Sequence, residues 1–163
     1  MLAVQAATEN LEVLDLLLSS DVELETPDFR GATPLMFAAL SGKTDSARRL
    51  LTAGARPGAQ DITGWTPLHY AARRGESLGV LLLLLSQEIS PKLDQPDFGG
   101  TTPLMVAAAY NNPQGASALW DAGADLHLSD NTGRSAIDYA RLKNASACVA
   151  LFESAGAGEK EKK

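Results

Sequence analysis

Four copies of one short segment recur along the chain at a nearly constant spacing. Each copy has the order Asp-x-x-Gly-x-Thr, with Ser replacing Thr in the last, and the copies begin at Asp28, Asp61, Asp97 and Asp130. The leading aspartates lie 33, 36 and 33 residues apart. A period of this length is typical of a solenoid, in which each unit buries its apolar face against its neighbours. With 45% hydrophobic residues, the chain has enough apolar side chains for such a core.

The residues after each of these segments predict two helices per unit. The hydroxyl residue can cap the first helix, and in three units proline follows it, where its missing N–H costs nothing. Apolar residues then recur at i, i+3 and i+4, as in Leu68, Ala71 and Ala72, which places them on one helix face. The left-handed conformation open to glycine and asparagine favours helix ends. We expect the first helices to end at Gly42, Gly75, Asn111 and Asn144, and second helices to end at Gly54, Gly123 and Gly156.

The third unit carries the fullest version of the pattern. Residues 61 to 75 read D-x-x-G-x-T-P-L-H-x-A-A-x-x-G, and L-L-x-x-G-A recurs later in a unit. Together with the period of 33, this pattern resembles the ankyrin repeat, and the resemblance covers roughly residues 2 to 157. It implies an all-α solenoid of antiparallel helix pairs joined by outward-projecting loops that resemble β-hairpins.

The resemblance predicts one array, 1–157, with a charged flexible tail at 158–163. Its repeats are predicted at 1–27, 28–60, 61–96, 97–129 and 130–157. The first lacks the Asp-x-x-Gly turn, so we expect the array to open on helices, with the terminal repeats acting as caps. The third repeat has a longer tail, and its loop after Leu85 is expected to bulge.

Composition and charge exclude several classes of protein. The net charge is −6 and the pI is near 4.8, and no dense Lys/Arg run is available to bind a phosphate backbone, so we expect no nucleic-acid partner. The apolar run from Val80 to Leu85 is too short to span a bilayer, and the first ten residues do not resemble a signal peptide. Cys148 is the single cysteine, so no intramolecular disulfide can form. We expect a monomer when unbound, located intracellularly in the cytoplasm or nucleus.

The sequence does not predict an enzyme. It contains no Gly-x-Ser-x-Gly elbow, no phosphate-binding P-loop and no His-Glu-x-x-His pair, and we expect no catalytic residue, cofactor or metal. In ankyrin repeats the histidine at the position of His69 usually bonds within the scaffold, and Thr66 is placed to orient it. Met36 and Met105 take the same position in neighbouring units, which favours packing over catalysis.

Candidate binding residues are those that the repeat pattern does not explain. The residue after the leading aspartate is Phe29, Ile62 or Phe98 in three successive turns, and Arg30 follows Phe29. These apolar side chains either pack against adjacent turns and rigidify that edge, or form a ladder offered to a partner. Trp65 occupies a position that varies between units, so we expect it to face outward.

A second group of candidates lies at the ends of the first helices. In ankyrin repeats these positions line the concave surface, which here places Arg73 and Arg74 in the middle of the groove and Tyr110 one unit further on. Trp, Tyr and Arg are the residue types enriched in binding hot spots, although an ordinary solvated arginine pair fits the sequence equally well.

These features favour a protein-binding scaffold or adaptor. We expect a partner protein or peptide, with acidic and hydrophobic residues, to bind along the hairpin tips and the concave helical face. The alternative is a substrate-recruiting ankyrin domain from a larger multidomain enzyme or signalling protein.

Overall fold

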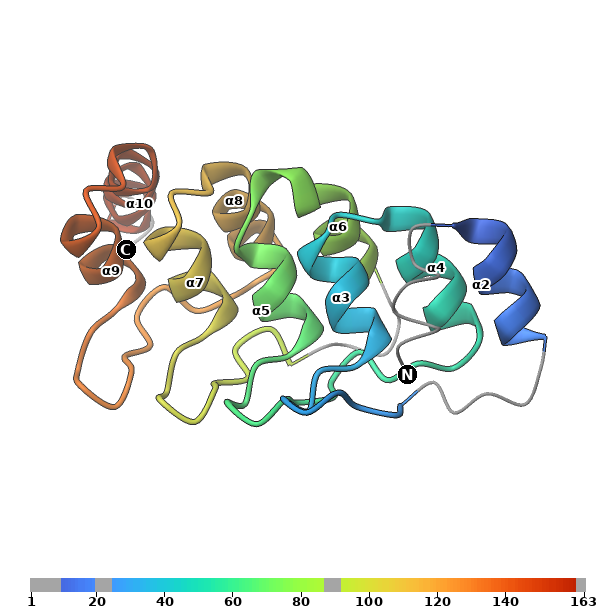
Figure 1. Cartoon of the computed structure of the whole chain (residues 1–163). Coiled ribbons are helices and arrows are strands. Elements are labelled where there is room, and N and C mark those ends of the chain that lie inside the picture. The colour runs from blue at the N-terminus through green and yellow to red at the C-terminus, as the bar shows by residue number, and fades with distance from the viewer. Residues whose placement is uncertain (1–9, 20–24, 87–91, 161–163) are drawn as a thin grey trace.

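The chain folds into two parallel rows of helices, with turns projecting along one edge (Figure 1). The computed structural model describes residues 10–19, 25–86 and 92–160. One row contains α2 (Leu11–Leu18), α4 (Thr44–Thr52), α6 (Leu78–Leu85), α8 (Pro113–Asp121) and α10 (Ser146–Lys160). The other row contains α3 (Pro34–Leu40), α5 (Pro67–Ala72), α7 (Pro103–Ala109) and α9 (Ala136–Leu142). The described residues contain no β-strand, only an isolated bridge between Ser129 and Ser135, so the predicted all-α solenoid is confirmed.

The core lies between the two rows and continues from unit to unit. The paired alanines of α3, α5 and α7 are fully buried, which lets neighbouring helices approach closely. Leucines from both rows complete the same cluster, among them Leu84 of α6 and Leu104 of α7, both at 0% exposure. Each unit therefore depends on its neighbours for the burial of its apolar face.

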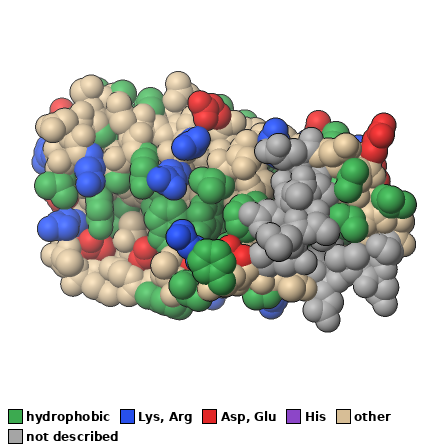
Figure 2. Space-filling model, in the orientation of Figure 1, with side chains coloured by type: hydrophobic (Ala, Val, Ile, Leu, Met, Phe, Trp, Pro, Cys, Tyr) green, Lys and Arg blue, Asp and Glu red, His purple; other side chains and the backbone are tan. Residues whose placement is uncertain are grey.

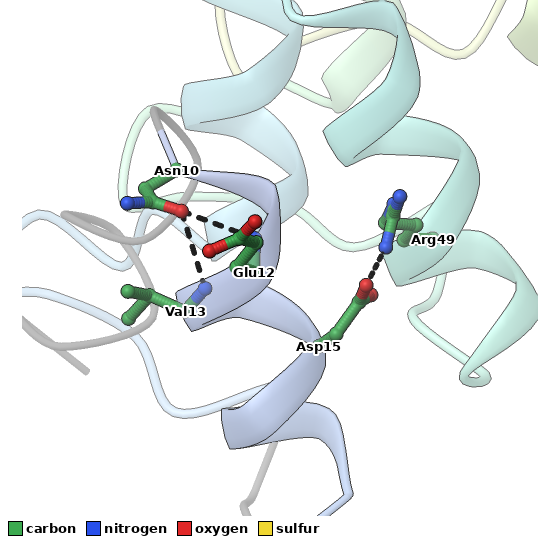
Figure 3. Close-up of polar contacts among 5 residues, drawn as sticks. All are labelled: Asn10, Glu12, Val13, Asp15 and Arg49. Atoms are coloured by element: carbon green, nitrogen blue, oxygen red, sulfur yellow. Dashed lines mark hydrogen bonds and ion pairs between the residues drawn. The ribbon is translucent and has the colours of Figure 1, made fainter.

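The helix starts lie at the predicted N-cap residues, but the hydroxyl accepts a backbone N–H only at Thr66 and Thr102, at 3.5 and 3.4 Å, among the four. Thr33, Thr66, Thr102 and Ser135 are the N-cap residues of α3, α5, α7 and α9. In the first unit Asn10 takes this role, because its side-chain oxygen accepts the N–H groups of Glu12 and Val13 at 3.1 and 3.3 Å (Figure 3). An ion pair between Asp15 and Arg49 then joins α2 to α4.

The helix end predicted at Gly75 is wrong. Gly75 does not adopt the left-handed conformation that favours a helix end. Arg74 before it already has an extended backbone (φ −136°, ψ 138°), and Gly75–Ser77 forms a short 3-10 helix, η1, that leads into α6. Gly42, Asn111 and Asn144 do adopt positive φ.

The last helix also differs from its prediction. It continues past Gly156 to Lys160, so the predicted helix end at Gly156 is wrong, and residues 158–160 of the predicted tail are helical. A glycine inside a helix costs about 1 kcal/mol relative to alanine, and the flanking Ala, Glu and Lys are strong helix formers. The rest of that tail, 161–163, the opening of the first unit at 1–9 and the bulge predicted after Leu85, at 87–91, lie outside the described residues.

Candidate functional site

The projecting turns share one hydrogen-bonding scheme. In the third unit, Oδ1 of Asp61 accepts the N–H groups of Thr63 and Trp65 at 2.8 and 2.9 Å, and the same arrangement recurs in the other three turns. Burial alone would raise the pKa of Asp61, but hydrogen bonds from Thr63, Tyr70 and Trp65 outweigh it and lower that pKa. The aspartate is therefore held ionised as the internal brace of its turn.

Backbone hydrogen bonds connect each turn to the next. The N–H of Ile62 donates to the carbonyl of Arg30 at 2.9 Å, and the N–H of Phe98 donates to the carbonyl of Thr63 at 3.0 Å. Asn131 donates to Gly99 in the same way, also at 3.0 Å. The four turns thus form one continuous edge of the array.

The apolar side chains at the turn tips are exposed. Phe29 is 86% exposed, Ile62 64% and Phe98 68%. The side chain of Ile62 lies beside Gly31 of the preceding turn, and the ring of Phe98 lies beside Gly64 in the same way. We call these three side chains the tip ladder.

The prediction that Trp65 faces outward is wrong. Its ring is half-buried, stacks on His69 at 5.9 Å between centroids and meets Tyr70 edge-on at 5.2 Å. Its Nε1–H donates to Oδ2 of Asp97 at 3.0 Å, so it ties the turn of the third unit to the turn of the fourth unit. In the fourth unit Val106 replaces the tyrosine that braces Asp61, and Trp65 supplies the missing donor.

His69 has the structural role that the resemblance implied. Its Nδ1 accepts the N–H of Thr66 at 3.1 Å, and its Nε2–H donates to the carbonyl of Thr101 in the next unit at 3.0 Å. The sulfur atoms of Met36 and Met105 accept the equivalent N–H groups in their own units, at 3.4 and 3.5 Å. Both ring nitrogens of the histidine are therefore occupied by the scaffold.

This histidine makes stability sensitive to mild acid. Burial lowers the pKa of His69 below its usual 6.5, against the opposing effects of the Thr101 carbonyl, Asp97 and Asp61. The unfolded chain therefore takes up the proton first as pH falls. The stability that the neutral histidine contributes is therefore fully present above about pH 6.5 and is lost as the pH falls below that value. Urea unfolding of wild type and His69→Met at pH 7.5 and 5.5 measures this: the variant is expected to lose less stability on acidification, and an equal loss contradicts the assignment.

A pocket of about 680 Å³ opens between the second and third units. Its walls come from two turns and from the exposed side of α3 and α5. Figure 2 shows hydrophobic side chains gathered in the middle of this face, with Lys or Arg side chains among them. The candidate residues that line the pocket are Phe29, Arg30, Ile62, Trp65 and Arg73.

The remaining candidates lie beside this pocket. The guanidinium carbon of Arg73 sits 4.7 Å from the centroid of the Tyr110 ring, an attractive cation–π arrangement. Arg73, Arg74 and Tyr110 also border a second, more polar hollow of about 410 Å³. The guanidinium group of Arg74 forms an ion pair with the carboxylate of Glu76 at 3.8 Å. Phe98 lies on the turn of the fourth unit and lines neither hollow.

Two aromatic residues of the pocket wall, Phe37 and Tyr70, were not predicted from the sequence. Phe37 and Tyr70 occupy the same position in successive units, between the Met or His and the paired alanines. Tyr70 donates its hydroxyl to Asp61 at 2.7 Å. The signal that finds it is the nine-residue spacing from Asp61 to Tyr70, which recurs between Asp130 and Tyr139 with the same bond.

Three further observations concern the described residues. No group of three or more His, Cys, Asp or Glu side chains among them is arranged to hold a metal ion, and none of their helices is long and apolar enough to cross a membrane. Cys148 is buried, which raises the pKa of its thiol to about 11. At neutral pH this side chain is a packed apolar group.

Comparison with known proteins gives a consistent result. Residues 1–95 match the family model "Ankyrin repeats (3 copies)", and residues 84–140 match "Ankyrin repeats (many copies)". The chain is 36% identical over 128 residues to neurogenic locus notch homolog protein 1 of Xenopus laevis, and 37% identical to its Mus musculus counterpart over the same length. These alignments cover 78% of this chain and 5% of each relative. The Drosophila melanogaster neurogenic locus Notch protein is 40% identical over 116 residues, 71% of this chain and 4% of its own length.

Proposed function

The chain belongs to the ankyrin repeat family, and from this we propose that it is a scaffold or adaptor that binds a partner polypeptide along its turn tips and first-helix face. Ankyrin repeats generally mediate protein–protein interaction and are generally non-catalytic. The proposed partner segment is extended and combines acidic with hydrophobic residues. Its apolar side chains contact the tip ladder and the pocket between the second and third units.

One observation carries this proposal: an apolar pocket is flanked by two arginines that form no ion pair with a described residue. Arg30 and Arg73 both line it, on a protein of net charge −6. Arg30 lies 5.4 Å from the centroid of the Phe29 ring, and Arg73 is half-buried against Tyr110. Both guanidinium groups are thus held beside apolar surface, where a carboxylate of a partner would form a charge-assisted hydrogen bond.

The tip ladder offers a first test. A partner is captured with the intact array, identified, and titrated onto a variant with Phe29→Ser, Ile62→Ser and Phe98→Ser. Because these side chains are mostly exposed, the free energy of unfolding is expected to change by less than about 1 kcal/mol, whereas affinity is expected to fall at least about tenfold.

Leu82→Ser is the matched control for this variant. Leu82 is 51% exposed on α6, in the other row of helices. The control is expected to keep the affinity of wild type. If the triple variant binds as wild type does, the ladder takes no part in recognition.

A second proposal keeps the same binding surface but makes the array the recruiting part of a larger enzyme or signalling protein. It is supported by the length of the relatives, of which the aligned segment is about 5%. In that case the polypeptide held in the pocket would be the substrate of an attached domain. Sequencing the full-length gene product and testing whether the captured protein is chemically modified distinguishes the two proposals.

Under either proposal we place the interaction inside the cell, in the cytoplasm or nucleus, with the unbound chain as a monomer. The single, buried cysteine fits a reducing compartment.

A further inference from the structure

The turns differ in what binds the second carboxylate oxygen of the leading aspartate. In three turns an aromatic side chain donates to this Oδ2 atom. Asp61 accepts from the Tyr70 hydroxyl at 2.7 Å, and Asp130 accepts from the Tyr139 hydroxyl at 2.7 Å. Asp97 accepts from the indole N–H of Trp65 at 3.0 Å. An aromatic donor is thus the regular partner of this oxygen.

The second unit lacks this donor. Asp28 uses Oδ1 to accept the N–H groups of Arg30 and Ala32, at 2.7 and 2.8 Å, and no described residue donates to its Oδ2. The cause lies in the sequence, because Phe37 occupies the position of Tyr70 and carries no hydroxyl. Asp28 is half-buried, and both it and Phe37 line the pocket between the second and third units.

We infer that this pocket accepts a tyrosine side chain of the partner, whose ring packs beside Phe37 and Ile62 and whose hydroxyl donates to Oδ2 of Asp28. The inference rests on the proposed function and names the residue that the pocket selects. The incoming phenol would provide the bond that Tyr70 provides to Asp61. Acidic residues on either side of that tyrosine would meet Arg30 and Arg73 at the rim.

The same geometry disfavours the nearest alternatives. A phenylalanine fills the apolar part of the pocket but leaves a half-buried carboxylate oxygen without a donor, which costs affinity. A carboxylate or a phosphorylated tyrosine brings negative charge next to Asp28 and Asp61, which also lines the pocket.

The test uses two capped pentapeptides with the sequence Asp-Glu-X-Glu-Asp, in which X is Tyr or Phe, and the full chain labelled with nitrogen-15. Binding is followed by the indole N–H signal of Trp65, which lies in the pocket wall. The Tyr peptide is expected to bind about tenfold more tightly than the Phe peptide. Phe37→Tyr supplies the hydroxyl from within the chain, so this ratio is expected to fall to about one.

Phe37→Tyr also has a readout that needs no ligand. Since its new hydroxyl would satisfy Asp28 as Tyr70 satisfies Asp61, the variant is expected to unfold at a higher urea concentration than wild type. An unchanged or lower midpoint means that Oδ2 of Asp28 is not an open acceptor and overturns the inference.

Equal affinities of the two peptides for the wild type, no binding of either, or a ratio that persists in Phe37→Tyr would also overturn it. These outcomes are distinguishable from failure of the proposed function. If both peptides bind equally and Ile62→Asp with Arg73→Glu removes both, the surface binds acidic apolar segments without selecting tyrosine. If a captured partner binds this double variant as it binds wild type, the proposed surface itself is wrong.

Discussion

Replacing Gly64 with alanine is expected to lower the free energy of unfolding by about 3 kcal/mol. Gly64 has a φ of +87°, and a Cβ there would lie 2.7 Å from the backbone nitrogen of Phe98 and 3.0 Å from the Cα of Asp97. The turn of the third unit would have to separate from the turn of the fourth unit, which weakens the hydrogen bond from the Phe98 N–H to the Thr63 carbonyl. Urea unfolding of the purified variant measures the loss.

Gly133→Ala is the matched control for this change. Gly133 has the same place in the last turn and a φ of +82°, but nothing lies within 4 Å of a Cβ built there. Its replacement retains the backbone penalty without the clash, so a loss of about 1 kcal/mol is expected. Equal losses at Gly64 and Gly133 would contradict the view that the turns pack as one continuous edge.

Most of the fold was predictable because its determinants are local. The N-cap hydroxyl, the proline after it and the i, i+3, i+4 spacing act within a few residues, and they recur in register along the chain. Thr66 and the helix that follows it show this plainly. The two wrong helix ends, at Gly75 and Gly156, lie where glycine permits a left-handed turn without requiring one.

The candidate site was predicted less completely because its determinants lie in different units. The position of Trp65 holds a different residue type in each unit, as a binding position would, yet the indole of Trp65 donates a hydrogen bond to Asp97 of the next turn. Its role depends on Val106, which lies 41 residues later and cannot donate a hydrogen bond. The open acceptor on Asp28 depends in the same way on Phe37, and both effects become visible only when the units are stacked.

Combining Ile62→Asp with Arg73→Glu is expected to weaken an identified partner complex at least about 100-fold. The first change puts a carboxylate at the most central apolar tip, where the partner's hydrophobic residues would lie. The second reverses the charge that would pair with its acidic residues. Ile62 is 64% exposed and Arg73 is half-buried at the end of α5, so the scaffold is expected to retain its fold. Trp65 is left intact because its replacement would also disturb the turn edge.

The measurement is the dissociation constant of that partner, determined by isothermal titration calorimetry, for wild type, the double variant and a control. The control, Leu82→Asp with Arg48→Glu, makes the same chemical changes at exposed positions on α6 and α4. The control is expected to bind within about threefold of wild type, while the double variant is expected to lose at least about 100-fold in affinity. Retained affinity in the double variant, with loss in the control, would place the partner on the opposite row of helices and rule out the proposed binding surface.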